Sequence, residues 1–253
     1  MERSMPHPLP DFLGIGVQKG GTTTLQRLLE CHPQVWLPPE KEVHFFSRHY
    51  ARGAQWYSGR FASALADQQC GEITPYYVFH PQAARRIAAL LPKVRLIVLL
   101  RDPLERCLSH YFHACRLGFE TLPLDAALAL EQERLAGAEA VLADPAGAHR
   151  SHQEHSYLAR SCYAEQLDRY EQSFTAEQML VLRSEDLFDD GGNVWNRVQE
   201  FLGLDAIPFP KSVKPANAGQ GEASAVPERL KETLRAQLVS TYRVMQERYG
   251  ICW

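Results

Sequence analysis

The sequence Val94-Arg95-Leu96-Ile97-Val98-Leu99-Leu100-Arg101-Asp102-Pro103 decides the fold of this chain. Its apolar run, residues 94–100, predicts a short strand that is buried on both faces, as the strands of parallel sheets are. Pro103 can stand in the first turn of a helix, and a helix is expected from Pro103 toward Leu117. The stretch therefore predicts a strand followed directly by a helix.

The start of the chain has the same order of strand, turn and helix. Phe12–Val17 is an apolar run, Gly20 and Gly21 interrupt it, and residues 22–31 carry leucines at helical spacing. Further strands are expected at 35–37, 70–73 and 179–182, and further helices within 51–65 and at 83–91, 122–140, 156–174, 194–202 and 227–249. Strands separated by helices predict a P-loop-like, three-layer α/β fold, with a central parallel sheet flanked by helices.

Length and composition limit the class of protein. A chain of 253 residues can bury a full core, so we expect one domain, 1–253, with a flexible N-terminus at 1–11. No apolar run approaches the ~18 residues of a transmembrane helix, and the N-terminus lacks the apolar core of a secretory signal. A net charge of −3 speaks against general nucleic-acid binding.

The spacing of the cysteines and histidines indicates the cellular location of the protein and whether a metal site is expected. The six cysteines lack CxxC spacing, which indicates reduced thiols in a cytoplasmic protein rather than disulfides or a zinc site. His149, His152 and His155 lie three residues apart, a spacing that could suggest metal ligands. Because no cysteine or carboxylate pattern accompanies them, no metal site is expected.

The first segment with candidate ligand-binding residues follows the opening strand. It consists of Gln18, Lys19, Gly20, Gly21, Thr22, Thr23 and Thr24. The glycines allow a tight turn whose amides converge on one point, and the next helix adds its N-terminal partial charge. Lys19 adds a full charge, and Thr22 and Thr23 can cap the helix and donate to ligand oxygens. The loop is thus a candidate anion site. It differs from a Walker A loop, in which the lysine follows the glycines, and the alternative is a plain turn with a solvated Lys19.

The second such stretch begins at the end of the best strand. Arg101 stands at its carboxyl end, where ligands of open α/β sheets bind, so Arg101 and Lys19 should face one crevice. A guanidinium fork suits a phosphate, and Ser109 on the following helix can donate to the same group. The alternative is a surface pair, Arg101–Asp102 or Arg106–Glu105, with a buried serine.

Five segments in order resemble the sulfotransferases that use 3′-phosphoadenosine-5′-phosphosulfate (PAPS). The loop 17–23 resembles their 5′-phosphosulfate loop, and 101–109 resembles their 3′-phosphate motif. Residues 41–46, Lys-Glu-Val-His-Phe-Phe, resemble a segment of the branch with heparan sulfate N- and 3-O-sulfotransferases and their bacterial relatives. Residues 163–167 and 183–187, followed by 200–204, resemble the bacterial members. The similarity extends from Phe12 to Leu204.

The resemblance implies a reaction and roles for residues. PAPS would bind with its 5′-phosphosulfate on the Lys19 loop and its 3′-phosphate on Arg101 and Ser109, with no metal. Lys19 would stabilise the leaving product, PAP, and Glu42 would be the general base. His44 is the rival base. Lys214 lies in 205–226, a segment expected to close over the nucleotide.

The sequence departs from the family pattern in two places, and several classes of acceptor are compatible with it. Ile73 stands where the heparan sulfate enzymes carry a lysine, and their C-terminal Lys-Gly-Arg motif is not reproduced. The acceptor is expected to offer a hydroxyl or amine on a carbohydrate, a lipid or another small molecule. A possible acceptor rim consists of Arg48, His49, Arg52, Trp56 and Tyr57. The competing functions are a non-catalytic nucleotide-binding module and a P-loop kinase-like phosphotransferase.

Overall fold

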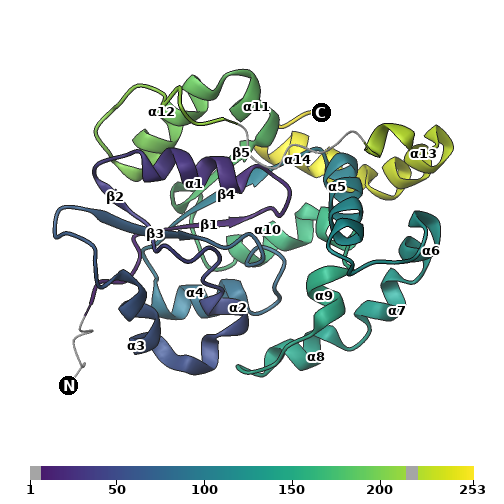
Figure 1. The fold of residues 1–253 in the computed structure, drawn as a ribbon, viewed down its shortest axis with the longest axis horizontal. Coiled ribbons are helices and arrows are strands. Elements are labelled where there is room, and N and C mark those ends of the chain that lie inside the picture. Colours follow the sequence, from purple (N-terminus) through teal and green to yellow (C-terminus); the bar gives the residue numbers. More distant parts are fainter. Residues whose placement is uncertain (1–6, 215–221) are drawn as a thin grey trace.

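A five-stranded, all-parallel sheet forms the centre of the molecule (Figure 1). The computed structural model describes residues 7–214 and 222–253. The strands are β1 (Phe12–Gly16), β2 (Val35–Trp36), β3 (Gln69–Ile73), β4 (Arg95–Leu100) and β5 (Met179–Arg183), in the order β2-β3-β1-β4-β5. The predicted α/β fold with a parallel sheet is confirmed.

Fourteen α-helices lie within the described residues. They are α1 (Thr22–Glu30), α2 (Phe45–Arg48), α3 (Gly53–Ser58), α4 (Ala83–Leu90), α5 (Pro103–Arg116), α6 (Leu124–Ala129), α7 (Glu131–Leu135), α8 (Ala138–Ala143), α9 (Arg150–Glu154), α10 (Tyr163–Glu171), α11 (Ser184–Asp189), α12 (Gly191–Leu202), α13 (Glu228–Gln237) and α14 (Val239–Tyr249). The described residues also form short 3-10 helices, namely η1 (Tyr50–Arg52), η2 (Gly59–Phe61), η3 (Ala159–Ser161), η4 (Ala176–Gln178) and η5 (Glu222–Ala225).

The sheet is buried on both faces by apolar side chains that alternate along each strand. In β4, Leu96, Val98 and Leu100 belong to one core, and Ile97 and Leu99 belong to the other. The first core includes side chains of α4 and α10, and the second includes side chains of α1 and α12. Figure 1 shows these pairs of helices on opposite sides of the sheet. The three-layer arrangement follows from the apolar runs of the strands.

Two long helices expected from the sequence are broken in the structure. Residues 122–140 form parts of three short helices, with breaks at Leu130 and Gly137, and Gly137 has a positive φ of 75°. Residues 227–249 form two helices that meet at the buried Leu238. The single-helix predictions are wrong because periodicity alone registers neither the left-handed conformation of Gly137 nor the turn at Leu238, which packs in a hydrophobic core. The helix expected at 156–174 is also shorter and begins at Tyr163.

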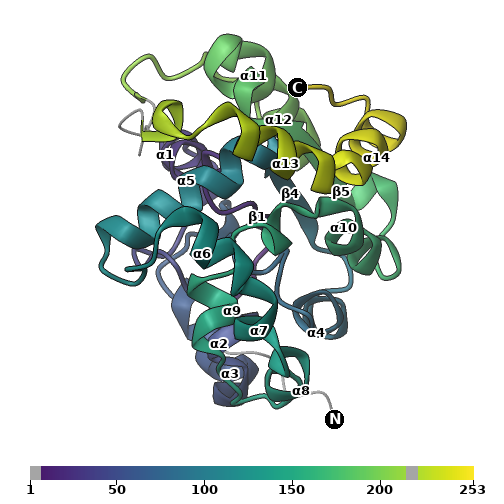
Figure 2. The ribbon, with the colours of Figure 1, turned by 90° about the vertical axis from the view of Figure 1, so that its right-hand side faces the viewer.

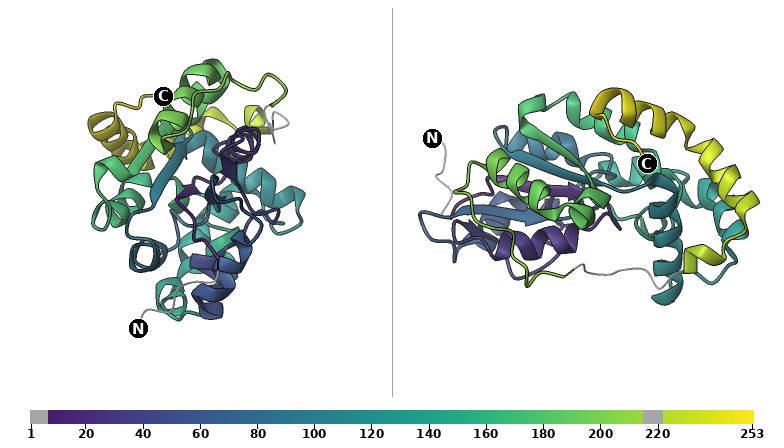
Figure 3. Two further views of the ribbon diagram at one scale, coloured as in Figure 1. Left: turned by 90° about the vertical axis from the view of Figure 1, so that its left-hand side faces the viewer. Right: turned by 90° about the horizontal axis from the view of Figure 1, so that it is seen from above.

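Helices α5 to α9, together with α13, extend the molecule beyond the carboxyl ends of the strands (Figure 1). Helices α6 to α9 form a group beside the sheet (Figure 2), and α13 packs on α5. Helices α13 and α14 lie at the same end of the molecule as α5 (Figure 3). Of the two segments predicted to be flexible or loop-like, residues 1–6 and 215–221 lie outside the described residues. Within 205–226, η5 is helical.

Candidate active site

The loop after β1 folds tightly against the end of β4. The amide of Val17 donates to the carbonyl oxygen of Leu99 at 2.9 Å, and the amide of Gly20 donates to that of Val17 at 3.0 Å. A Cβ atom on Gly20 would lie 2.6 Å from the Leu99 oxygen, so the close approach requires glycine. Lys19 and Gly21 have positive φ angles of 72° and 86°. The predicted glycine turn is therefore present.

The first turn of α1 follows this loop without a side-chain cap. Gly21 is the N-cap, so the prediction that Thr22 and Thr23 cap the helix is wrong. The chain turns one residue earlier, and Thr22 and Thr24 are buried while Thr23 is half-buried. The first turn contains no acidic residue. Its amides and the helix dipole favour an anion in front of the loop.

Lys19 lies among other cationic side chains. Burial and the positive charges of Arg116, Arg101 and Arg106 lower the pKa of Lys19 from 10.5 to about 8, and Glu222 opposes this shift. Several cations gathered around one loop raise the electrostatic potential there, which suits a ligand with several negative charges.

Arg101 reaches the Lys19 loop from the end of β4. Its Nη1 lies 3.5 Å from the carbonyl oxygen of Lys19, and its Nη2 lies 3.6 Å from Oε2 of Glu105. The hydroxyl of Tyr163 donates to the Arg101 carbonyl at 2.8 Å. The structure thus brings the two predicted anion motifs to one edge of the sheet. Neither of the surface pairs considered as alternatives forms, because Arg101 pairs with Glu105 and Arg106 is buried.

Ser109 and Lys214 occupy different settings. Ser109 is half-buried on α5, one turn after Glu105 and therefore on the same face of the helix as that residue. This face is the one that Arg101 approaches. Lys214 is exposed and is the last residue described before the gap at 215–221.

Glu42 and His44 form a pair in a segment that contacts the start of α1. The Oε2 atom of Glu42 lies 3.0 Å from Nε2 of His44, and Nδ1 of His44 lies 3.1 Å from Oγ of Ser47. Lys41 donates through Nζ to the carbonyl oxygen of Thr22 at 3.1 Å. This bond ties the segment with Glu42 to the start of α1. The two candidate bases are therefore neighbours of each other and of the anion loop.

A buried carboxylate that the sequence analysis did not single out supports this pair. Glu72 accepts hydrogen bonds from the hydroxyls of Tyr57 at 2.8 Å, Tyr77 at 2.7 Å and Thr74 at 2.9 Å. Oγ1 of Thr74 also accepts the amide of His44 at 3.3 Å. Burial raises the pKa of Glu72, and the three donors oppose that shift. A chain of hydrogen bonds thus runs from Glu72 to the backbone of His44.

The proposed acceptor rim is present in part. The guanidinium groups of Arg52 and Arg60 lie over the ring of Trp56, at 4.9 and 4.8 Å from its centroid, and the ring of His49 meets it edge to face. Tyr57 is fully buried, so its assignment to the rim is wrong. Its hydroxyl points into the core, where it donates a hydrogen bond to Glu72. Ile73 is packed in the apolar core on the α1 side of the sheet.

The histidines at 149, 152 and 155 serve as structural side chains. Nδ1 of His152 lies 2.8 Å from the hydroxyl of Tyr76, and burial together with the charge of Arg160 lowers the pKa of His152 to about 2. No cluster of three or more His, Cys, Asp or Glu side chains in the described part of the chain is arranged to hold a metal ion. Among the same residues, no helix is both long and apolar enough to cross a membrane.

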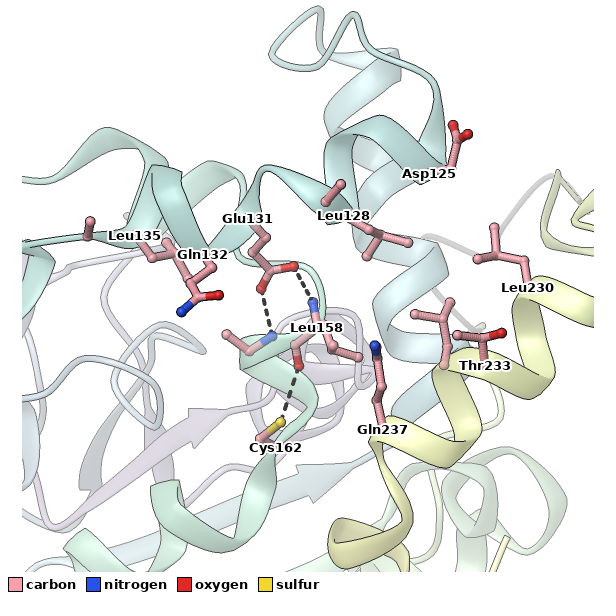
Figure 4. A pocket seen from close by; sticks show the side chains of 14 residues that line it. Asp125, Leu128, Glu131, Gln132, Leu135, Leu158, Cys162, Leu230, Thr233 and Gln237 are labelled. Atoms are coloured by element: carbon pink, nitrogen blue, oxygen red, sulfur yellow. Dashed lines mark hydrogen bonds between the residues drawn. The ribbon is translucent and has the colours of Figure 1, made fainter.

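A separate pocket of about 580 Å³ lies between α6–α7 and α13 (Figure 4). Leucine side chains, Leu128, Leu158 and Leu230 among them, face it, and its charged lining residues are Asp125 and Glu131. The pocket is therefore apolar with an acidic contribution. A sulfonucleotide with several negative charges is disfavoured there, and the cationic loop remains the candidate anion site.

Comparisons with known proteins agree with this geometry. Residues 9–216 match the family described as the sulfotransferase domain. Heparan sulfate glucosamine 3-O-sulfotransferase 3B1 of Mus musculus is 31% identical over 264 residues, which cover 95% of this chain and 62% of that protein. The membrane-associated sulfotransferase kil1 of Dictyostelium discoideum is 27% identical over 309 residues, with 95% and 64% covered. The crystal structure of a sulfotransferase from Alicyclobacillus acidocaldarius has a TM-score of 0.77 and 27% identity, with 95% of each chain covered.

The chain belongs to the sulfotransferase domain family, because the family match covers more than half of its length. The resemblance seen in the sequence is thereby confirmed. The chain spans less than two thirds of the length of the two curated relatives named above, 62% and 64%.

Proposed function

We propose that this protein is a PAPS-dependent sulfotransferase that transfers the sulfuryl group to a hydroxyl or amine of an acceptor. The observation that carries this proposal is the contact between Arg101 and the backbone of Lys19, which joins the two anion motifs at one sheet edge. The family match supports the donor, since PAPS is the co-substrate that the family implies. Sulfotransfer requires positioning and charge stabilisation, and both are available at this edge.

In this proposal, the two anion motifs bind the nucleotide. The loop 18–24, with Lys19, Gly20 and Gly21, holds the 5′-phosphosulfate, and Arg101 with Ser109 holds the 3′-phosphate. Lys214 would contribute from the segment that precedes η5. No residue is assigned to a metal.

The chemical step is an in-line substitution at sulfur. A bond forms between the acceptor oxygen or nitrogen and sulfur, while the bond from sulfur to the bridging phosphate oxygen breaks. The acceptor proton passes to Glu42, and Lys19 stabilises the negative charge that develops on departing PAP. His44, 3.0 Å from Glu42, orients the carboxylate and is the alternative base. The contact between Glu42 and His44 supports a shared proton-transfer site.

The acceptor is the open part of the proposal. We infer a carbohydrate, a lipid or another small molecule with a free hydroxyl or amine. The cationic and aromatic side chains Arg52, Trp56 and Arg60 form a surface on which such a molecule could lie. The relatives named as heparan sulfate enzymes support the carbohydrate class, and the different side chain at Ile73 argues for an acceptor bound differently from theirs.

Incubation with isotope-labelled PAPS and a panel of acceptors from each class tests this proposal. A product that gains the mass of one sulfuryl group, together with release of PAP, is the expected result. A protein that binds PAP but transfers sulfur to no acceptor would be a nucleotide-binding module. Phosphate transfer from ATP–magnesium would instead indicate a kinase-like phosphotransferase.

A further inference from the structure

Two fully buried arginines, Arg106 and Arg160, lie beside the anion loop. Arg106 is 0% exposed and Arg160 is 4% exposed. No carboxylate of the described residues lies within ion-pair distance of either guanidinium group. Both border one small cavity, together with Val17 and Gln18 of the loop.

Arg160 holds the loop through a side chain. Its Nη1 donates to Oε1 of Gln18 at 2.5 Å, and its Nη2 donates to the carbonyl oxygens of His152 at 3.1 Å and Gln153 at 2.6 Å. The guanidinium also lies over the ring of Tyr76, at 4.8 Å. Arg160 thus connects α9, an aromatic wall and the residue that precedes Lys19.

Arg106 comes from α5, the helix that follows Arg101. Its Nε donates to Oγ of Ser161 at 2.7 Å, and its Nη2 donates to the carbonyl oxygen of Tyr157. Its buried Nη1 has no hydrogen-bond partner among the described residues, and the same is true of Nε of Arg160. The two cations are therefore incompletely satisfied by the protein around them.

The carboxylates near Arg160 act on it from beyond ion-pair distance. Burial and the charges of the two arginines lower the pKa of His110 well below its ordinary value, and burial with the charge of Arg160 lowers that of His152 to about 2, so both imidazoles are neutral at neutral pH. Glu42 and Glu131 are the carboxylates that act on Arg160 electrostatically. Burial lowers the pKa of Arg160 to about 10, so the group is still charged at neutral pH. Two like charges side by side in an apolar interior are unfavourable unless an anion binds nearby.

We infer that Arg106 and Arg160 form a positively charged back wall of the phosphosulfate site. Arg160 positions Gln18 and with it the Lys19 loop, and both charges stabilise a bound anionic nucleotide through the loop. This inference rests on the proposed function, because it assumes that the loop binds PAPS. Neither residue is assigned direct contact with the reacting atoms, so both are positioning residues.

A matched set of variants separates charge from structural support. Arg160→Lys keeps the charge, and Arg160→Gln keeps part of the hydrogen bonding but removes the charge. Arg86→Gln is the control, because Arg86 is also buried, 3% exposed, donates to the carbonyls of Phe46, Leu142 and Asp144, and belongs to α4. Arg106→Gln and Arg106→Lys repeat the comparison on α5.

Calorimetric titration with PAP at several salt concentrations is the primary measurement, and thermal unfolding with and without PAP is the second. We expect Arg160→Gln and Arg106→Gln to bind PAP roughly tenfold or more weakly, with a smaller salt dependence. Arg160→Lys should recover most of the affinity, and Arg86→Gln should lose stability while its folded fraction binds PAP normally.

Two results would overturn the inference. One is wild-type PAP affinity in both charge-removing variants, and the other is an equal loss of affinity in Arg86→Gln. If a glutamine variant does not fold, the lysine variants and their salt dependence still test the role of charge. Failure of the wild-type protein to bind PAP would refute the proposed function itself, which distinguishes the two failures.

Discussion

The Oε2 atom of Glu42 lies 3.0 Å from Nε2 of His44, and the backbone of His44 is bonded through Thr74 to the buried Glu72. The candidate base therefore belongs to a connected network rather than to a mobile surface side chain. The same segment is tied to the anion loop by Lys41, whose Nζ donates to the carbonyl oxygen of Thr22. Acceptor activation and nucleotide binding are thus adjacent in the fold.

Glu42→Gln should separate catalysis from nucleotide binding. The amide keeps the shape of the carboxylate but cannot accept the acceptor proton, so the rate should fall roughly 10²–10⁴-fold while PAP affinity stays close to wild type. Initial-rate kinetics and calorimetry measure the two quantities. His44→Ala should lose less activity, because it removes a positioning contact.

The reverse pattern would change the assignment. An active Glu42→Gln together with an inactive but folded His44→Ala would make His44 the base. If both variants remained active, the base would lie outside residues 41–46.

Lys19→Ala should reduce turnover by orders of magnitude and weaken PAPS binding, since a partly buried charge contact to an anion is lost. The pKa of Lys19 in the free protein is about 8, so kcat/KM for PAPS should fall as the pH rises through about 8, where the ammonium loses its proton. Lys19→Arg, whose charge persists, should extend the plateau to higher pH.

A second lysine provides the control for this pH profile. Burial lowers the pKa of Lys41 to about 8 as well, and Glu42 opposes the shift. Lys41→Arg should leave the fall near pH 8 in place if Lys19 causes it. A wild-type rate for Lys19→Ala at saturating PAPS would exclude its role at the leaving group.

Arg101 should determine the preference for a 3′-phosphate. The wild-type protein should strongly prefer PAPS to adenosine 5′-phosphosulfate, and Arg101→Ala should lose most of that preference, a difference of about 2–3 kcal/mol for a charged hydrogen bond. Competition between the two nucleotides, measured by calorimetry, checks this. Arg95→Ala, at the opposite end of β4, is the control and should keep the preference. Equal binding of both nucleotides by the wild type would remove the assignment of Arg101 and Ser109.

The buried Glu72 gives a prediction about stability. Because its pKa is raised in the folded state, Glu72 stabilises the fold most below the pKa of the unfolded chain, and this contribution is lost as the pH rises through the folded pKa. Glu72→Gln cannot ionise. Its free energy of unfolding, relative to wild type, should therefore increase as the pH rises above about 4.5, the ordinary value of the group. Denaturant titrations across this range test the sign, and a difference that decreases with pH would contradict the account.

The sheet and the anion motifs were predictable because local sequence determines them. The apolar side chains of residues 94–100 are all buried when this segment is a strand covered on both faces. Gly20 and Gly21 allow the tight turn that follows the first strand. The order of strands then brings Arg101 to Lys19, since the carboxyl ends of parallel strands meet at one edge.

The parts that could not be predicted depend on contacts between distant residues. Arg160 bonds to Gln18 across 142 positions, and nothing near either residue indicates the other. Tyr57 looks like a surface aromatic in its helix, but its partner Glu72 lies in β3. The helix break at the fully buried Leu238 depends in the same way on what packs against it, whereas the break at Gly137 is local, because this exposed glycine has a positive φ of 75°.

Calorimetric titration with PAP in the presence of a chelator, and with ATP–magnesium in a separate run, shows whether the edge formed by Lys19 and Arg101 is a PAPS site. We expect tight PAP binding in the presence of a chelator, strongly weakened in both Lys19→Ala and Arg101→Ala, with much weaker binding of ATP–magnesium. Binding of ATP–magnesium in preference to PAP, or PAP binding that neither substitution affects, would contradict that assignment.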